Sequence, residues 1–368
     1  MHDQLQWLKL MSMSWLGPTL QAGLIKRFIN PINAAKATIE EILDIQGFDY
    51  KRAARFLREF YETKPICSTE EISEKGIRFV NYNEEEYPVF LKEIADAPVG
   101  LFVKGKLCAK APTIAIVGSR NGTQMGYDIA REFASTLAKA GFVIISGLAL
   151  GIDTHAHIGA LEAKSQTIAV TASGLDIVYP KGNQKVRKRI IEEGGAIVSE
   201  YPPGMPALPW HFPVRNRIIS GMSMGILVIE ANAQSGSLIT ARLAGEQNRD
   251  IFAIPGNINQ SCAQGTIALL KDGAEIVTDP EDLINYYSDS LPNRPIKKSK
   301  TIVDDMTDDE KKLYDILAKE PSTVDSLLDN GWKPEILFSL LLQLEMRDYI
   351  IKLPNNCYQS RLKENRRK

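Results

Sequence analysis

The feature that most constrains the fold is an alternation of short apolar segments with amphipathic ones, which begins near residue 113. The short segments, rich in β-branched residues, are 113–117, 142–145, 167–171, 196–199, 226–229 and 251–254. The amphipathic segments between them, expected to be helices, are 124–140, 153–163, 184–193, 214–220 and 238–247. This alternation is typical of parallel sheets, because each parallel strand needs a crossover before the next one. The sequence therefore predicts an α/β fold with a doubly wound, Rossmann-like parallel sheet.

The chain is too long for one ordinary domain, since its 368 residues exceed the roughly 100 to 200 of a typical domain. Residues 1–65 have apolar side chains at helical spacing and predict a small helical domain of the SAM or helix-hairpin-helix type. Its glycine turn at 45–48 either contacts a phosphate through backbone amides or simply joins two helices. The extended Rossmann-like domain is expected to span 66–287.

The C-terminal part has a different character. Residues 288–304 are rich in Ser, Pro, Asn and Lys, which is typical of a linker. A winged-helix domain is predicted over 305–360, followed by a basic tail at 361–368. Its expected elements are helices at 308–319, 324–329 and 334–346 and strands at 349–353 and 357–359. The last helix carries Glu335 and Glu345, so we expect it to contact protein rather than a DNA groove.

Composition narrows the class of protein. The net charge of −1 means that any nucleic-acid binding must be local. Residues 1–16 lack the uninterrupted apolar stretch of a signal peptide or membrane span, which predicts a cytoplasmic protein without membrane contact. The four cysteines form no Cys-x-x-Cys pair, and His155 and His157 point to different sides of a helix. We therefore expect no metal site.

The loops that follow the strands are the place to look for a ligand, because open parallel sheets bind ligands beyond the carboxyl ends of their strands. The first loop contains Gly118, Ser119 and Arg120, where helix-start amides and a guanidinium could hold a phosphate. The second contains Gly147, and Asp153 beyond it is expected to cap the next helix. The sequence has neither the glycine spacing of a dinucleotide-binding loop nor a P-loop, so we expect no NAD, no ATP hydrolysis and no cofactor.

The most informative segment combines an aromatic residue with two arginines, since Phe212 is followed by Arg215, Asn216 and Arg217. Phe212 could stack on a base while the arginines bind backbone phosphates, as in single-strand binding proteins. Alternatively, Phe212 belongs to the core and one arginine pairs with Glu230.

Two further loops complete the candidate site. Lys181 precedes a basic helix whose charges either contact DNA or form a solvated face. Ser235, Gly236 and Ser237 offer hydroxyls and amides at another helix start, although either serine could simply cap that helix. Because these loops meet at one edge of the sheet, they predict a site for a polyanion. A base that stacks on Phe212 must be unpaired, so the expected ligand is single-stranded DNA. Stacking and phosphate contacts do not read base edges, so we expect little sequence preference.

A series of ordered motifs between about residues 87 and 274 carries a family resemblance. The motifs are Gly118-Ser119-Arg120, 146–161, Tyr179-Pro180, Ser199-Glu200, Phe212-Pro213-x-Arg215-Asn216-Arg217-x-Ile219-Ser220-Gly221, Glu230-Ala231, 235–241 and Pro255-Gly256. In these motifs the sequence resembles the DNA-processing protein A family, DprA, also known as Smf. The resemblance implies a dimer, not an enzyme, that binds single-stranded DNA and loads the RecA recombinase onto it in natural transformation. It also implies that Arg120, Lys181, Phe212, Arg215 and Arg217 match the family's DNA-contacting motifs.

Two other functions stay open at this point. Rossmann-like proteins also bind nucleotides or cleave N-glycosidic bonds, and Glu230 at a strand end could serve as an acid or base. The end domains could instead make the chain an adaptor whose main role is protein contact. Turnover of nucleoside monophosphates that is lost in Glu230→Gln would favour the enzyme. Truncation after Tyr287 that removes a partner but not DNA affinity would favour the adaptor.

Overall fold

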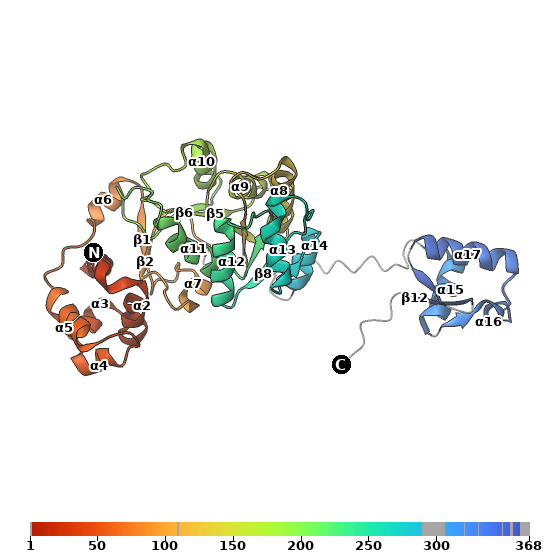
Figure 1. Ribbon diagram of the computed structural model, residues 1–368, viewed down its shortest axis with the longest axis horizontal. Helices are drawn as coiled ribbons and strands as arrows, with labels where there is room; N and C mark the ends of the chain where they lie inside the picture. Colours follow the sequence, from red (N-terminus) through yellow and green to blue (C-terminus); the bar gives the residue numbers. More distant parts are fainter. Residues whose placement is uncertain are drawn as a thin grey trace. The chain divides into compact units, whose positions relative to one another are not determined.

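The computed structural model describes residues 2–108, 110–288, 306–319, 321–329, 331–347, 349–353 and 356–360. They belong to two compact units, Met1–Pro292 and Asn293–Lys368 (Figure 1). The expected linker lies outside the described residues except for Ser288, and the expected basic tail lies outside them entirely.

The first unit is built on a nine-stranded sheet in the order β1-β2-β6-β5-β4-β3-β7-β8-β9. Its strands are β1 Arg78–Asn81, β2 Gly100–Gly105, β3 Thr113–Val117, β4 Val143–Ser146, β5 Thr167–Val170, β6 Ala196–Ser199, β7 Gly225–Val228, β8 Asp250–Ala253 and β9 Glu275–Ile276. Strands β3 to β9 pair in parallel, which confirms the predicted α/β fold with a doubly wound sheet. Strands β1 and β2, which the sequence analysis did not predict, extend one edge in antiparallel orientation.

Helices cover both faces of the sheet (Figure 1). The main ones are α7 Val89–Glu93, α8 Gln124–Lys139, α9 Ile152–Glu162, α10 Gln184–Glu192, α11 His211–Gly221, α12 Gly236–Glu246, α13 Gln264–Lys271 and α14 Pro280–Tyr286. Ile114 and Ile116 of β3 pack with α8, α9 and α14 on one face. Ala115 and Val117 of the same strand pack with α7, α11 and α12 on the other. This alternation is the period of two expected for a strand buried on both sides.

The order of the strands creates a crevice between β3 and β7. These strands are neighbours, but the chain proceeds from β3 to β4 on one side and from β7 to β8 on the other. The loops that leave β3 and β7 therefore diverge, and ligands of doubly wound sheets bind at such a point. Helix α11 connects the two halves of the sheet, so its first turn also lies near this crevice.

The N-terminal helices share a hydrophobic core with the antiparallel edge of the sheet. They are α1 His2–Ser12, α2 Gly17–Phe28, α3 Pro31–Lys36, α4 Ile39–Leu43, α5 Tyr50–Glu59 and α6 Thr69–Glu74. Trp7 and Phe56 belong to the same buried cluster as Phe79 of β1 and Phe102 of β2. The helical segment and the sheet thus form one compact unit, and a domain boundary after residue 65 stays a prediction.

The described residues of the second unit form three helices and a small antiparallel sheet. Its elements are α15 Asp308–Lys319, β10 Ser322–Thr323, α16 Val324–Asp329, α17 Pro334–Met346, β11 Ile350–Leu353 and β12 Cys357–Ser360. The strand order is β10-β12-β11, and Leu313, Leu337 and Leu344 belong to its core. Assignment of this unit as a winged helix stays a prediction. Across the described parts of both units, no helix combines the length and apolar character required to span a membrane.

His157 on α9 gives the first unit a dependence of stability on pH. The imidazole is fully buried, its Nδ1 lies 2.8 Å from Thr167 Oγ1, and its Nε2 has no hydrogen-bond partner. Burial lowers the pKa of His157 to about 3, with the Arg215 charge adding to the effect. In the unfolded chain this histidine takes up a proton near pH 6.5, whereas in the folded protein it stays neutral. The folded state therefore has its full stability above pH 6.5, and this stability is lost as pH falls toward 3.

We expect the unfolding free energy of the wild type to fall between pH 7.5 and 5.0 by about 2 kcal/mol more than that of His157→Leu. Urea unfolding of both proteins at the two pH values measures the difference. Equal pH dependence in both would show that His157 is not the responsible group.

Candidate nucleic-acid interface

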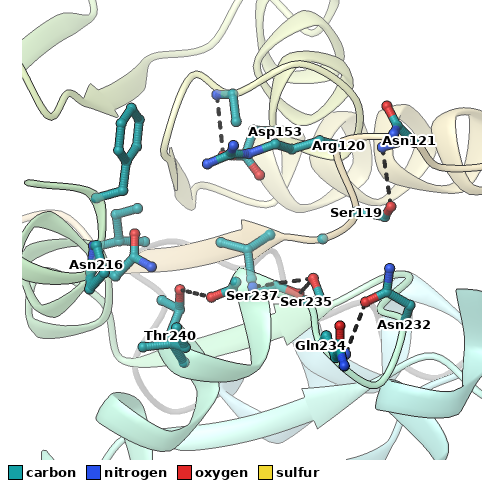
Figure 2. Close-up of a pocket in the computed structure, with 18 of the residues that line it drawn as sticks. Ser119, Arg120, Asn121, Asp153, Asn216, Asn232, Gln234, Ser235, Ser237 and Thr240 are labelled. Carbon is teal, nitrogen blue, oxygen red and sulfur yellow. Dashed lines mark hydrogen bonds between the residues drawn. The ribbon is translucent and has the colours of Figure 1, made fainter. Parts of the chain in front are cut away.

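A pocket of about 610 Å³ opens at the carboxyl edge of the sheet, between the loops that follow β3 and β7 (Figure 2). Its lining includes Gly118, Ser119, Arg120, Phe212, Arg215, Asn216, Ser235, Gly236 and Ser237. Gly147 lines an adjoining cavity of about 100 Å³ together with Arg120, Phe212 and Arg215. The fold therefore brings together all the predicted site residues except Lys181 and Arg217.

Arg120 is presented by a tightly packed loop. The backbone N of Ser119 donates to the carbonyl O of Glu230 at 2.7 Å, which ties this loop to the end of β7. Gly151 in the neighbouring loop has a positive φ of 83°, and a Cβ there would lie 2.4 Å from the carbonyl O of Ser119. The loop is thus held from two sides, while the Arg120 side chain is exposed to solvent in the pocket.

Phe212 is flanked by two guanidinium groups. The Cζ atoms of Arg120 and Arg215 lie 5.3 and 5.8 Å from the centre of its ring, within the range of cation–π attraction. Tyr179 packs against the same ring, with centroids 5.6 Å apart. Phe212 is half-buried and belongs to none of the buried core clusters among the described residues. An aromatic surface beside positive charge suits a base and its phosphates.

Arg215 is a buried part of the pocket wall. Its Nη1 donates to the carbonyl O of Gly147 at 2.7 Å and also to that of Val170. Burial lowers the pKa of Arg215 to about 10, an effect that the Asp153 carboxylate opposes, so the guanidinium stays charged at neutral pH. Arg215 therefore contributes a fixed positive charge to the pocket.

Gly147 has two charged groups close to it. A Cβ at this position would lie 2.7 Å from Asp153 Oδ2 and 2.9 Å from Arg215 Nη2. Asp153 Oδ2 accepts hydrogen bonds from the backbone N atoms of Gly147 and Ala149, at 3.1 and 3.4 Å. The N-cap of α9 is Gly151, so the expected capping role of Asp153 is wrong. Asp153 instead lies in the first turn and holds the preceding loop.

The N-terminus of α12 forms another part of the wall. Ser235 is its N-cap, and its Oγ accepts from the backbone N of Ser237 at 3.3 Å. The two hydroxyls lie 2.7 Å apart. The capping role that the sequence left open for Ser235 is therefore present, and it is compatible with anion binding because the first amides of a helix attract negative charge.

Arg217 lies outside the pocket, which corrects its place among the predicted contacts. Its side chain is only 4% exposed and pairs with Asp96 at 3.1 Å and with Glu200 at 2.7 Å. The expected acidic partner, Glu230, is not involved. Residues two positions apart point to nearly opposite sides of a helix, so α11 cannot direct both Arg215 and Arg217 into one pocket.

Glu230 has a structural role in the loop after β3. Its two carboxylate oxygens accept from the backbone N and the Oγ1 of Thr123, at 2.8 and 2.6 Å. The side chain does not line the larger pocket, so the acid or base role that the enzyme alternative requires has no support in the geometry. Among the residues that the structure describes, no group of three or more His, Cys, Asp and Glu side chains is arranged to hold a metal ion.

The pocket also contains residues that sequence reasoning missed. Tyr179, Asn232 and Gln234 line it, although only Tyr179 had a signal in the sequence, as an aromatic residue beside the basic loop. Lys181 is exposed in the same loop but does not line either cavity described above. Its contact with DNA stays a prediction.

Comparison with known proteins gives a consistent result. Residues 78–288 match the family described as DNA recombination-mediator protein A. The chain is 36% identical to Protein Smf of Escherichia coli over 96% of this chain and 95% of that protein. It is 40% identical to the DNA processing protein DprA of Streptococcus pneumoniae over 67% of this chain and 86% of that protein.

Two solved structures resemble this one. The X-ray structure of DprA from Streptococcus pneumoniae has a TM-score of 0.64 and 34% identity, covering 77% of this chain and 97% of that chain. A structure of DNA processing protein A from Helicobacter pylori, described by its single-stranded DNA binding mode, has a TM-score of 0.53 and 30% identity. That likeness covers 59% of this chain and 99% of the Helicobacter chain.

Proposed function

Because this chain belongs to the DNA recombination-mediator protein A family, we propose that its pocket binds single-stranded DNA and that the protein loads the RecA recombinase onto the bound strand. The family is one of recombination mediators and not of catalytic enzymes. The single-stranded DNA binding described for the Helicobacter pylori protein supports the proposal.

The observation that carries the proposal is the combination of Phe212 with two arginines. A base can stack on the exposed part of the Phe212 ring only if it is unpaired, which favours a single strand over a duplex. Arg120 can then approach the neighbouring phosphate, and the start of α12 offers amides to another. None of these groups reads the edge of a base, so we propose little sequence preference.

The partner proposals rest on different features. A recombination mediator acts on a recombinase, and we propose that RecA is this partner. On α17, Phe338, Leu342 and Met346 are exposed at intervals of one turn, which supports protein contact there. We also propose a homodimer through the Rossmann-like domain.

The direct test is the affinity of the full chain for a labelled oligothymidine and for a duplex, measured by fluorescence anisotropy over a salt series. We expect preference for the single strand and a steep loss of affinity with salt. Arg120→Ala should reduce the slope of log K against log salt by about 0.7, the value for one phosphate contact to a single strand.

Lys139→Ala is the matched control, because Lys139 is exposed at the far end of α8, at the opposite edge of the sheet. It should leave the slope unchanged. Equal slopes for Arg120→Ala and the wild type would exclude a phosphate contact by Arg120. Absence of single-strand binding by the wild type would exclude the proposed function.

A further inference from the structure

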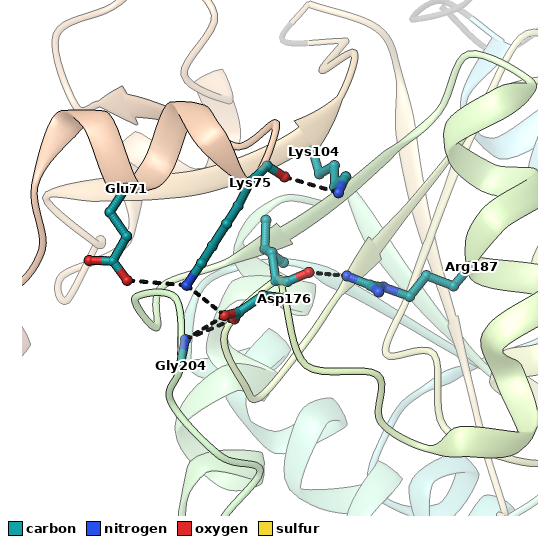
Figure 3. Close-up of polar contacts among 7 residues, drawn as sticks. Glu71, Lys75, Lys104, Asp176, Arg187 and Gly204 are labelled. Atoms are coloured by element: carbon teal, nitrogen blue, oxygen red, sulfur yellow. Dashed lines mark hydrogen bonds and ion pairs between the residues drawn. The ribbon is translucent and has the colours of Figure 1, made fainter.

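Asp176 lies where two loops of the pocket begin. It belongs to the loop that leads from β5 to Tyr179 and Lys181. Its two carboxylate oxygens accept from the backbone N of Gly204, at 2.8 and 3.0 Å (Figure 3). Gly204 belongs to the loop that leads from β6 to Phe212. One carboxylate therefore joins the loop that carries Tyr179 to the loop that leads into α11, whose first turn carries Phe212.

Further contacts hold the same two loops. The backbone N of Gly174 donates to the carbonyl O of Met205 at 2.8 Å. Arg187 of α10 donates through its guanidinium to the carbonyl O of Leu175 (Figure 3). Gly174 and Leu175 directly precede Asp176 in the chain, so the Tyr179 loop is held at three consecutive residues.

Lys75 connects this junction to the end of α6. Its Nζ lies 2.9 Å from Asp176 Oδ2 and 3.1 Å from Glu71 Oε1 (Figure 3). Lys104 of β2 donates to the carbonyl O of Lys75 at 3.1 Å. Burial opposes ionisation of Asp176, but the Gly204 amide and the Lys75 ammonium hold its pKa below the usual value. The carboxylate is thus charged at neutral pH.

We infer that Asp176 is a positioning residue for the DNA pocket: it fixes the Tyr179 loop against the loop that precedes Phe212 and, through Lys75, holds both to α6. This inference rests on the proposed function. By charge alone, an acid near a polyanion site is unfavourable. Removal of the Asp176 carboxylate should therefore weaken DNA binding if the residue positions the loops, and strengthen DNA binding if only its charge matters.

The sign of the change in affinity therefore distinguishes a positioning role from a charge effect. If Asp176 acted only through its charge, Asp176→Ala would strengthen oligothymidine binding. If it positions the loops, we expect Asp176→Ala to weaken binding about tenfold. Asp176→Asn keeps an oxygen that can accept from Gly204, so its affinity should lie between those of Asp176→Ala and the wild type. The measurement is anisotropy of labelled oligothymidine with the full chain at one salt concentration.

Glu192→Gln is the matched control, because it removes an exposed acid from α10 and should leave the affinity equal or slightly higher. Lys75→Met completes a double-mutant cycle with Asp176→Ala. We expect the combined loss to be smaller than the product of the single losses, since both changes break one ion pair. Thermal melting checks that each variant is folded, and Asp176→Asn decides the question if Asp176→Ala does not fold.

Equal or tighter binding by folded Asp176→Ala or Asp176→Asn would overturn the inference alone, provided that Arg120→Ala still weakens binding. Failure of the wild type to bind the single strand would instead reject the proposed function, and this inference with it.

Discussion

Arg217→Ala is expected to lower the unfolding free energy by about 3 kcal/mol without removing a DNA contact. The guanidinium is buried between Asp96 and Glu200, whose side chains are 34% and 18% exposed. Its removal leaves two carboxylates that are only partly hydrated. The value lies at the low end of the range for broken buried pairs because water reaches Asp96. Urea unfolding at pH 7 measures the change.

The control for this prediction is Arg242→Ala, which breaks an exposed pair with Glu246 and should cost less than about 0.5 kcal/mol. Replacing the pair together, as in Arg217→Met with Glu200→Gln, should be less destabilising than Arg217→Ala because fewer charges stay unpaired. A stable Arg217→Ala variant with weakened oligothymidine binding would contradict this account and return Arg217 to the DNA site.

The combined variant Arg120→Ala with Phe212→Ala is expected to weaken oligothymidine binding by about 100-fold or more. Stacking of one base on an aromatic ring contributes about 1 to 3 kcal/mol. A hydrogen bond to a charged group contributes about 1.5 to 3 kcal/mol. Their sum is about 2.5 to 6 kcal/mol. The lower end of this range is close to the roughly 2.7 kcal/mol that corresponds to 100-fold. Anisotropy titration at low salt measures the change.

The two single variants should not combine additively, because the Arg120 guanidinium lies 5.3 Å from the centre of the Phe212 ring. Phe212→Trp should retain most of the affinity, since it keeps an aromatic surface, and Lys139→Ala should bind like the wild type. Wild-type affinity in the combined variant would mean that the pocket serves another ligand.

The sequence was sufficient to predict the parallel sheet and the position of the loops that line the pocket. The strand segment 113–117 coincides with β3, and 196–199 with β6. These strands are buried on both faces, so nearly all their residues are apolar, and such continuous apolar runs can be recognised in the sequence. The antiparallel strands β1 and β2 were not predicted, although Leu101, Phe102 and Val103 form a short apolar run, because they stand outside the alternation of strand and helix segments. Their place in the sheet is decided by pairing along its edge.

The separation of Arg215 from Arg217 depended on the tertiary structure. Both residues stand in one basic motif, but the rotation of α11 about its axis decides which of them faces the pocket. The sequence shows the helical period of α11 but not which side of the helix faces the pocket. That direction follows from which apolar residues of α11 pack against the sheet.

The sequence by itself thus determined the α/β class, the order of strands and helices between residues 113 and 254, and the set of loops that carry charge and aromatic residues. These properties follow from local periodicity and composition. Only the tertiary structure decided which side chains make contact. The Tyr179 ring packs against Phe212, Asp176 pairs with Lys75 and accepts from Gly204, and Glu230 accepts from Thr123. Such contacts join residues far apart in the chain, and burial and close packing select them only when the whole unit is assembled.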